Sequence, residues 1–171
     1  MSGMFSNCSS LATLNVGNFN TAKTTNMNRI FDNCAKLNSI DVSGFDTSKV
    51  TDMGYMFYNC SLVTKLDVND FNTENVTDMS GMFSNCLNLA SLNVTGFNTA
   101  NVINMNRMFN NCQNLKELDV TNFDTSNVTD FADIFCNCLL IKSLDISNFN
   151  TSNATDLSEM FLSCVKLTSL K

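Results

Sequence analysis

The side chains of this sequence that could carry out chemistry are its cysteines and its carboxylates. Eight cysteines are present, and seven of them recur at a constant step of 26 residues, at Cys8, Cys34, Cys60, Cys86, Cys112, Cys138 and Cys164. A metal site or a disulfide framework is one interpretation, but no C-x-x-C pair occurs. Because equivalent positions of a repeat stack on one face and free cysteine packs as a small hydrophobe, the favoured interpretation is a ladder of core thiols.

The eighth cysteine, Cys136, stands outside this step, two residues before Cys138. Other repeats hold mostly surface residue types at its position, namely Asp32, Tyr58, Ser84, Asn110 and Leu162. Two interpretations stay open: an exposed and reactive thiol, or variation within the repeat that has no function.

Aspartate and asparagine follow the same step and form what we call the Asx ladder: Asn15, Asp41, Asp67, Asn93, Asp119 and Asp145. On a parallel sheet Asp41 would neighbour Asp67, and two carboxylates about 5 Å apart resemble a glycosidase pair. These are repeat positions, however, and no unique constellation stands out. The sequence has no histidine, which removes Ser-His-Asp and Cys-His catalysis and all His-based metal sites. We therefore expect a protein that is not an enzyme.

Stacked carboxylates repel one another across strands, and a cation that prefers oxygen ligands, such as Ca²⁺, could reduce that repulsion. The simpler interpretation is that solvent and the intervening asparagines reduce the repulsion without a bound ion. We therefore expect no cofactor and no metal, with calcium as the alternative.

Phenylalanine shares the period of 26 and identifies the elements that must position these side chains. Two further ladders run through Phe5, Phe31, Phe57, Phe83, Phe109, Phe135 and Phe161, and through Phe19, Phe45, Phe71, Phe97, Phe123 and Phe149. The opening MSGMFSNC also returns unchanged at residues 79–86. The chain is therefore a tandem repeat.

Each repeat is expected to hold one short strand, one bend and one short helix. Alternation around Leu118, Asp119 and Val120 predicts a half-buried strand. Residues 51–57 place apolar side chains at helical spacing over about two turns, with Thr51 as N-cap and Asp52 at the positive end of the helix dipole. The F-N/D-T-x-x-V segment between them predicts a turn.

A strand and a helix in 26 residues fall within the range of leucine-rich repeats. We predict a right-handed, leucine-rich-repeat-like α/β solenoid with one short parallel strand and one short helix per coil. Residues 1–171 would form a single domain of about 6.5 repeats, without terminal caps. A single coil cannot bury enough surface to be stable alone, so neighbouring coils must stack.

The composition of the chain excludes several classes of protein and of partner. The hydrophobic content of 44% excludes intrinsic disorder, and a net charge of -6 argues against a nucleic-acid partner. No apolar stretch is long enough to cross a bilayer, so we expect no direct membrane insertion by this chain. The N-terminus lacks the basic and apolar regions of a signal peptide, so any export signal must lie outside this chain.

The expected concave face carries the Asx ladder, with Lys65 and Glu117 just before it. Because this face is polar and poor in aromatic residues, it predicts weak or avidity-driven binding. A second candidate surface on the helical side holds Tyr55, Tyr58, Arg29 and Arg107, which could equally be solvated.

The motif M-F-x-N-C-x-x-L-x-x-L-D-V-x-x-F-D/N-T-S-N-V-T-D-M resembles the BspA-like leucine-rich-repeat surface proteins, most closely the repeats of mycoplasma-type surface lipoproteins. The residues that carry it are Met82, Phe83, Cys86, Leu89, Leu92, Val94 and Phe97, followed by residues 124–130. The resemblance covers the whole chain and implies a cell-surface or extracellular module that binds host or neighbouring macromolecules, without catalytic activity.

Two functions follow as hypotheses. The first is adhesion by non-covalent binding of a protein partner. The second is a structural role, in which copies associate through uncapped ends into a filament or matrix. Since 171 is not a multiple of 26, a seamless joint between copies would need overlap, missing residues or a changed junction.

Overall fold

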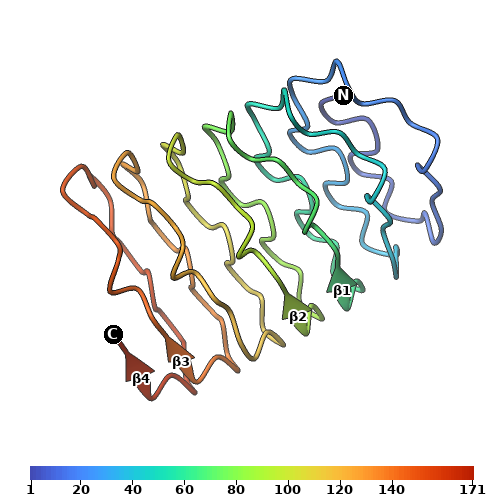
Figure 1. The fold of residues 1–171 in the computed structure, drawn as a ribbon. Coiled ribbons are helices and arrows are strands. Elements are labelled where there is room, and N and C mark those ends of the chain that lie inside the picture. Colours follow the sequence, from blue (N-terminus) through green and yellow to red (C-terminus); the bar gives the residue numbers. More distant parts are fainter.

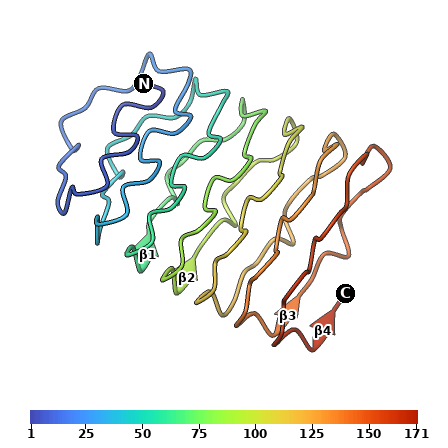
Figure 2. The ribbon, with the colours of Figure 1, turned by 180° about the vertical axis from the view of Figure 1, so that it is seen from behind.

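The computed structural model describes residues 1–171 as a series of coils that stack side by side from the N-terminus to the C-terminus (Figure 1). The view from behind shows the same order of coils (Figure 2). Four two-residue strands are present: β1 Lys65–Leu66, β2 Ser91–Leu92, β3 Ser143–Leu144 and β4 Ser169–Leu170. β1 pairs with β2 and β3 with β4, both in parallel.

The register of these pairs equals the sequence period. Lys65 lies opposite Ser91, and Ser143 lies opposite Ser169, so each residue meets its equivalent 26 positions later. A second line of parallel bridges, which the sequence analysis did not anticipate, joins Asn26, Asp52, Asp78, Asn104, Asp130 and Asp156 in succession. Two lines of backbone pairing therefore connect the coils.

The predicted helix in each coil is wrong, because the structure contains no helix. In the segment 53–60 the N–H groups of Tyr55, Phe57 and Asn59 donate to carbonyls of the next coil. The N–H groups between them, those of Met56 and Tyr58, donate to the carbonyl three residues back. The segment is a run of tight turns that also ties two coils together.

Left-handed backbone explains why these turns do not become a helix. Tyr55 has φ 55° and Asn59 has φ 54°, and the equivalent residues of the other coils repeat this pair of positive values. One left-handed residue breaks a right-handed helix, and asparagine tolerates this conformation better than most residues. Thr51 is accordingly no N-cap: its hydroxyl donates to the carbonyl of Thr25 in the preceding coil.

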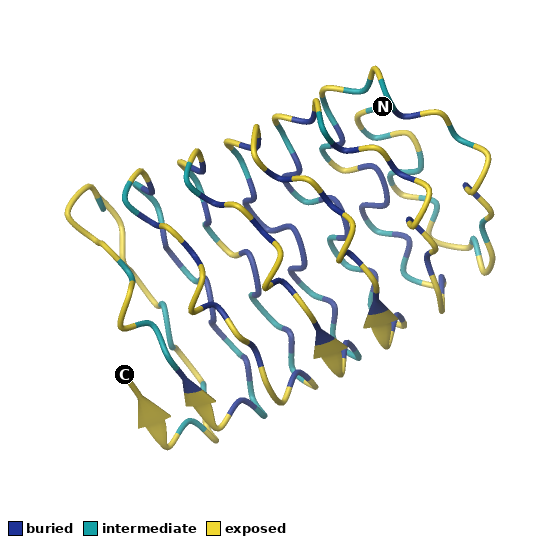
Figure 3. Ribbon diagram, viewed as in Figure 1, coloured by how far each residue is buried: buried dark blue, intermediate teal, exposed yellow.

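The core is one continuous cluster that runs through the stack, and Figure 3 shows the buried residues concentrated in the inner coils. Phe31, Phe57, Phe83 and Phe109 are fully buried, and successive rings stack with centroids 5.6–5.8 Å apart. Phe45, Phe71, Phe97 and Phe123 of the second ladder are also buried, whereas Phe19 and Phe149 are half-buried.

The cysteines line the same core as free thiols. Cys34, Cys60, Cys86, Cys112 and Cys138 are buried, while Cys8 and Cys164 in the end coils are half-buried. Burial raises the pKa of Cys34 to about 11 and that of Cys86 to about 12, because a thiolate would lose its hydration. These thiols stay protonated, and a protonated buried thiol is chemically inert.

Threonine contributes a further set of contacts between coils. The hydroxyls of Thr21, Thr47 and Thr73 donate to main-chain carbonyls 25 residues later, at 2.9–3.0 Å. All three side chains are buried. Each coil is thus held to its neighbour by backbone and hydroxyl donors. The structure has no helix that could cross a membrane.

Candidate functional site

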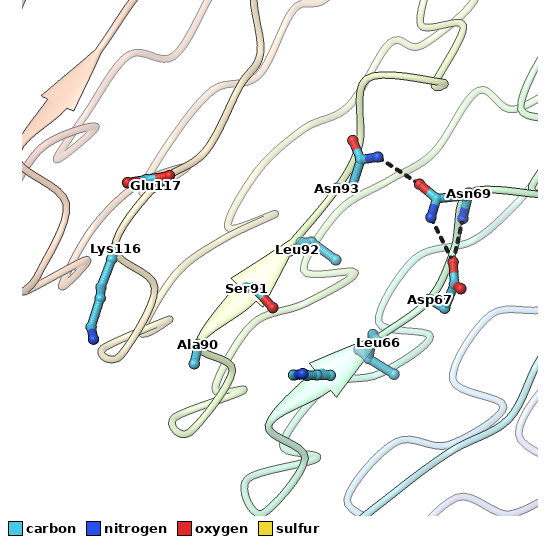
Figure 4. Close-up of a pocket in the computed structure, with 10 residues that line it drawn as sticks. Leu66, Asp67, Asn69, Ala90, Ser91, Leu92, Asn93, Lys116 and Glu117 are labelled. Carbon is cyan, nitrogen blue, oxygen red and sulfur yellow. Dashed lines mark hydrogen bonds between the residues drawn. The ribbon is translucent and has the colours of Figure 1, made fainter.

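A pocket of about 570 Å³ opens over β1, β2 and the coil after them, and Figure 4 shows the side chains around it. We call it the strand-side groove. It is lined by Lys65, Leu66, Asp67, Asn69, Ala90, Ser91, Leu92, Asn93, Lys116 and Glu117. The two leucines form its apolar floor, since both point into the core and are nearly covered.

The strand-side groove brings together four of the residues that the sequence marked for binding: Lys65, Asp67, Asn93 and Glu117. The other members of the Asx ladder, which are Asn15, Asp41, Asp119 and Asp145, lie outside it in other coils. The sequence analysis missed Lys116, which adds a second ammonium group at the rim.

Each member of the Asx ladder is fixed by a turn of its own. The carboxylate of Asp67 accepts from the N–H of Asn69 at 3.2 Å and from its side-chain amide at 2.8 Å. The amide of Asn93 donates in turn to the side-chain oxygen of Asn69 at 2.7 Å, which links two coils (Figure 4). The groove therefore presents polar groups that are already oriented before any partner arrives.

These turns also affect the ionisation of three carboxylates of the ladder. Hydrogen bonds from Ser43, Thr121 and Ser147 lower the pKa values of Asp41, Asp119 and Asp145 respectively. At Asp119 the repulsion from Asp145 is the smallest of the contributing effects. Hydrogen bonds within the turns therefore favour the ionised form of these three carboxylates.

Asp133 and Cys136 of the sixth repeat form a small cluster of possible ligands with Glu159 of the next coil, and the ligand atoms of the three lie within 4.8 Å of one another. An exposed Cys136 is ruled out, because only 4% of this residue is accessible. Burial and the two carboxylates raise the pKa of Cys136, and Asp133 is already paired with Arg107 at 2.9 Å. A protonated thiol beside an ion pair is a poor ligand set for a metal.

A second pocket, of about 400 Å³, lies on the turn segments rather than on the strands. We call it the turn-side pocket. It is lined by Arg29, Tyr55, Tyr58, Ser84, Asn85, Arg107 and Asn110. The structure therefore brings together all four residues of the second candidate surface. The sequence analysis treated Ser84 only as a surface position, yet it is 1% exposed.

Stacked coils of 26 residues with two polar pockets define a tandem-repeat protein. The family model described as "Mycoplasma protein of unknown function, DUF285" matches the chain twice, over residues 1–93 and 84–170. The chain therefore belongs to this mycoplasma family. No curated protein and no solved structure matches it.

Proposed function

We propose that this chain is a non-enzymatic binding module of a microbial cell surface, and that it contacts a protein partner through the strand-side groove. The observation that carries this proposal is the groove itself, which spans three coils and presents two ammonium groups and two carboxylates. A surface of mixed charge with oriented polar groups favours specificity and association rate over raw affinity.

The same proposal includes the finer family assignment. The motif around Met82, Phe83 and Cys86 and the 26-residue period support a relation to the BspA-like leucine-rich-repeat surface proteins. Membership in a mycoplasma repeat family supports a surface location. The absence of catalysis is supported by the Asx ladder, because its carboxylates serve their own turns.

The test is a binding screen with charge-reversed variants. The immobilised chain is exposed to a panel of purified extracellular-matrix and cell-surface proteins, and binding is followed by biolayer interferometry. We expect a partner whose binding is lost in Asp67→Lys, which reverses a charge in the strand-side groove. Lys23→Glu, at an exposed site away from the groove, is the control and should bind as the wild type does. Binding that ignores Asp67→Lys would refute the groove as the contact surface.

End-to-end assembly is a second candidate function, favoured by the two end coils. Inner coils pass N–H donors forward, as from Asp133 to Ser158 and from Phe135 to Met160. Because every coil uses the same donors and acceptors, a coil of a second copy could pair with this stack in the same way.

Light scattering over a range of concentrations, with electron microscopy of the same sample, tests this second function. Linear assemblies that grow with concentration are expected for a structural polymer. A monodisperse monomer at all concentrations would refute it and leave the binding module.

A further inference from the structure

The turn-side pocket lies where a small residue of one coil, Ser84, stands between large residues of the neighbouring coils. Gly81 and Ser84 occupy the positions that hold Tyr55 and Tyr58 one coil earlier. One coil later, the same positions hold Arg107 and Asn110. The Tyr55 ring covers Gly81, so the hollow lies over the small side chain of Ser84, and large side chains from both sides form its walls.

Ser84 lies at the bottom of this hollow with an unused hydrogen-bonding group. Its hydroxyl is buried and has no partner, and it is the one buried side-chain polar atom of the chain in this state. A buried polar group without a partner is costly, and such a group in a native structure calls for an explanation. Because Ser84 lines the turn-side pocket, a ligand that enters the pocket and displaces the side chains over this hydroxyl would supply the missing partner.

The rim of the pocket offers further unused donors. Arg107 donates through Nε to Asp133 and Arg29 through one terminal nitrogen to Asp32, which leaves the other terminal nitrogens without a protein acceptor. About half of each arginine side chain is exposed, at 52% and 47%. The supporting carboxylates are nearly covered and do not line the pocket.

The asparagine row beside the pocket is interrupted at the same place. The side-chain amide of Asn59 donates to Asn33, and that of Asn111 donates to Asn85. The amide of Asn85 makes no such bond to Asn59, so its N–H groups are also free at the pocket wall. Guanidinium, amide and hydroxyl donors thus belong to residues that line one pocket, with no carboxylate among the lining residues.

We propose that the turn-side pocket binds the carboxylate of an Asp or Glu side chain from an acidic segment of a partner protein. Guanidinium forks match the geometry of a carboxylate, and Tyr and Arg are the residue types that dominate protein-binding hot spots. This site shares no residue with the strand-side groove, so it stands independently of the function proposed above.

The aromatic residues favour a peptide carboxylate over an acidic sugar. A sugar ring needs a free aromatic face on which to stack. The guanidinium of Arg29 already lies over the ring of Tyr55, 4.4 Å from its centroid. Tyr58 meets the same ring edge-on, with centroids 5.7 Å apart and an interplanar angle of 64°. The two rings therefore brace Arg29 and wall the pocket instead of forming a platform.

The experiment measures binding of a fluorescently labelled octaglutamate peptide to the full chain by anisotropy, at low salt and at physiological salt. Because the chain has a net charge of -6, a general electrostatic field would repel this peptide, and only local donors can hold it. We expect binding that weakens as salt rises, and no binding of the octaglutamine peptide.

Two variants locate the site. Arg107→Gln should weaken octaglutamate binding about tenfold, which is the order expected for one charge-assisted contact. Ser84→Ala removes only the hydroxyl, keeps the fold and should weaken binding several-fold. Lys23→Gln changes the net charge by the same amount at a distant exposed site and is the matched control.

The proposal is overturned if Arg107→Gln and Lys23→Gln have equal effects, or if Ser84→Ala binds as tightly as the wild type. It is also overturned if the pocket takes a glucuronate-containing oligosaccharide but not the peptide. A thermal unfolding curve of each variant shows that the comparison is made between folded chains.

Discussion

The thiol of Cys86 donates a hydrogen bond to the backbone carbonyl of Phe57, which lies 3.2 Å away in the preceding coil. The same contact joins Cys34 to Phe5, Cys60 to Phe31, Cys112 to Phe83 and Cys138 to Phe109, always across 29 residues. A side chain that packs like a hydrophobe thus also connects the coils by hydrogen bonds. This double role explains why cysteine, rather than alanine or valine, suits the position.

Removing one of these thiols should destabilise the stack measurably. We expect Cys86→Ala to lower the free energy of unfolding by about 1–2 kcal/mol, since it leaves a small cavity and removes a buried hydrogen bond. Urea unfolding followed by circular dichroism measures the change. Cys8→Ala is the matched control, because Cys8 is half-buried in the first coil and should cost clearly less. Equal losses at the two positions would contradict the proposed contribution of the buried contact.

The same thiols predict a loss of stability at high pH. Burial raises the pKa of Cys86 from its ordinary 9.0 to about 12, so the unfolded chain releases this proton well before the folded chain does. The contribution is fully present below pH 9 and is lost as the pH rises from 9 toward 12. Each such thiol should remove up to about 1.4 kcal/mol per pH unit in that window.

Unfolding free energies measured between pH 8 and pH 11 test this expectation. Cys86→Ala should show a shallower decline than the wild type, because it has one fewer buried thiol to ionise on unfolding. Identical slopes would mean that Cys86 titrates in the folded chain as it does in the unfolded one.

The repeat and its core could be predicted from the sequence because side-chain type and spacing determine them directly. Cys86 and Phe83 recur at a fixed step and are apolar, and burial follows from those two facts. The Asx ladder was also found from its spacing. Its members act as turn acceptors, a role that depends on the main chain of the residue two positions later.

The backbone of residues 53–60 could not be predicted from apolar spacing alone, because a run of turns and a short helix place Met53, Met56 and Phe57 on one side in the same way. The signal that separates the two is Asn59, since asparagine precedes six of the seven cysteines of the ladder and is left-handed at each of these positions. The turn-side pocket could not be predicted from the sequence for another reason. Its hollow depends on a difference between repeats at Ser84, and a difference of this kind is not visible in the positions that the repeats share.

The turn made by Asp119 predicts a difference between two similar substitutions. Asp119 accepts from the N–H of Thr121 at 3.0 Å and from its hydroxyl at 2.6 Å. Asp119→Ala removes both bonds and should lower the melting temperature. Asp119→Asn should keep them, because Asn93 at the equivalent position makes the same pair of bonds to Thr95.

Acid unfolding adds a second readout for this residue. Hydrogen bonds from Thr121 lower the pKa of Asp119 below its ordinary 3.8, so its stabilising contribution is present above pH 3.8 and is lost as the pH falls further. Asp119→Asn, which has no proton to take up, should show a weaker pH dependence than the wild type below pH 3.8. A steeper dependence in the variant would contradict this assignment.

Substitution of Gly81 should separate the cost of backbone strain from the cost of side-chain crowding. Its φ is +55°, and a Cβ atom there would lie 2.5 Å from Cε1 of Tyr55. Gly81→Ala must therefore displace the Tyr55 ring in addition to adopting a left-handed backbone, which by itself costs about 1–2 kcal/mol. Gly3 has a similar φ of +62°, but the atom nearest to an added Cβ would lie 3.8 Å away, so Gly3→Ala bears the backbone cost alone.

We expect a larger loss of unfolding free energy in Gly81→Ala than in Gly3→Ala. We also expect weaker octaglutamate binding in Gly81→Ala, because the Tyr55 ring supports Arg29. Equal losses of unfolding free energy in the two variants would show that the Tyr55 ring is displaced at no cost and does not form a rigid wall of the turn-side pocket.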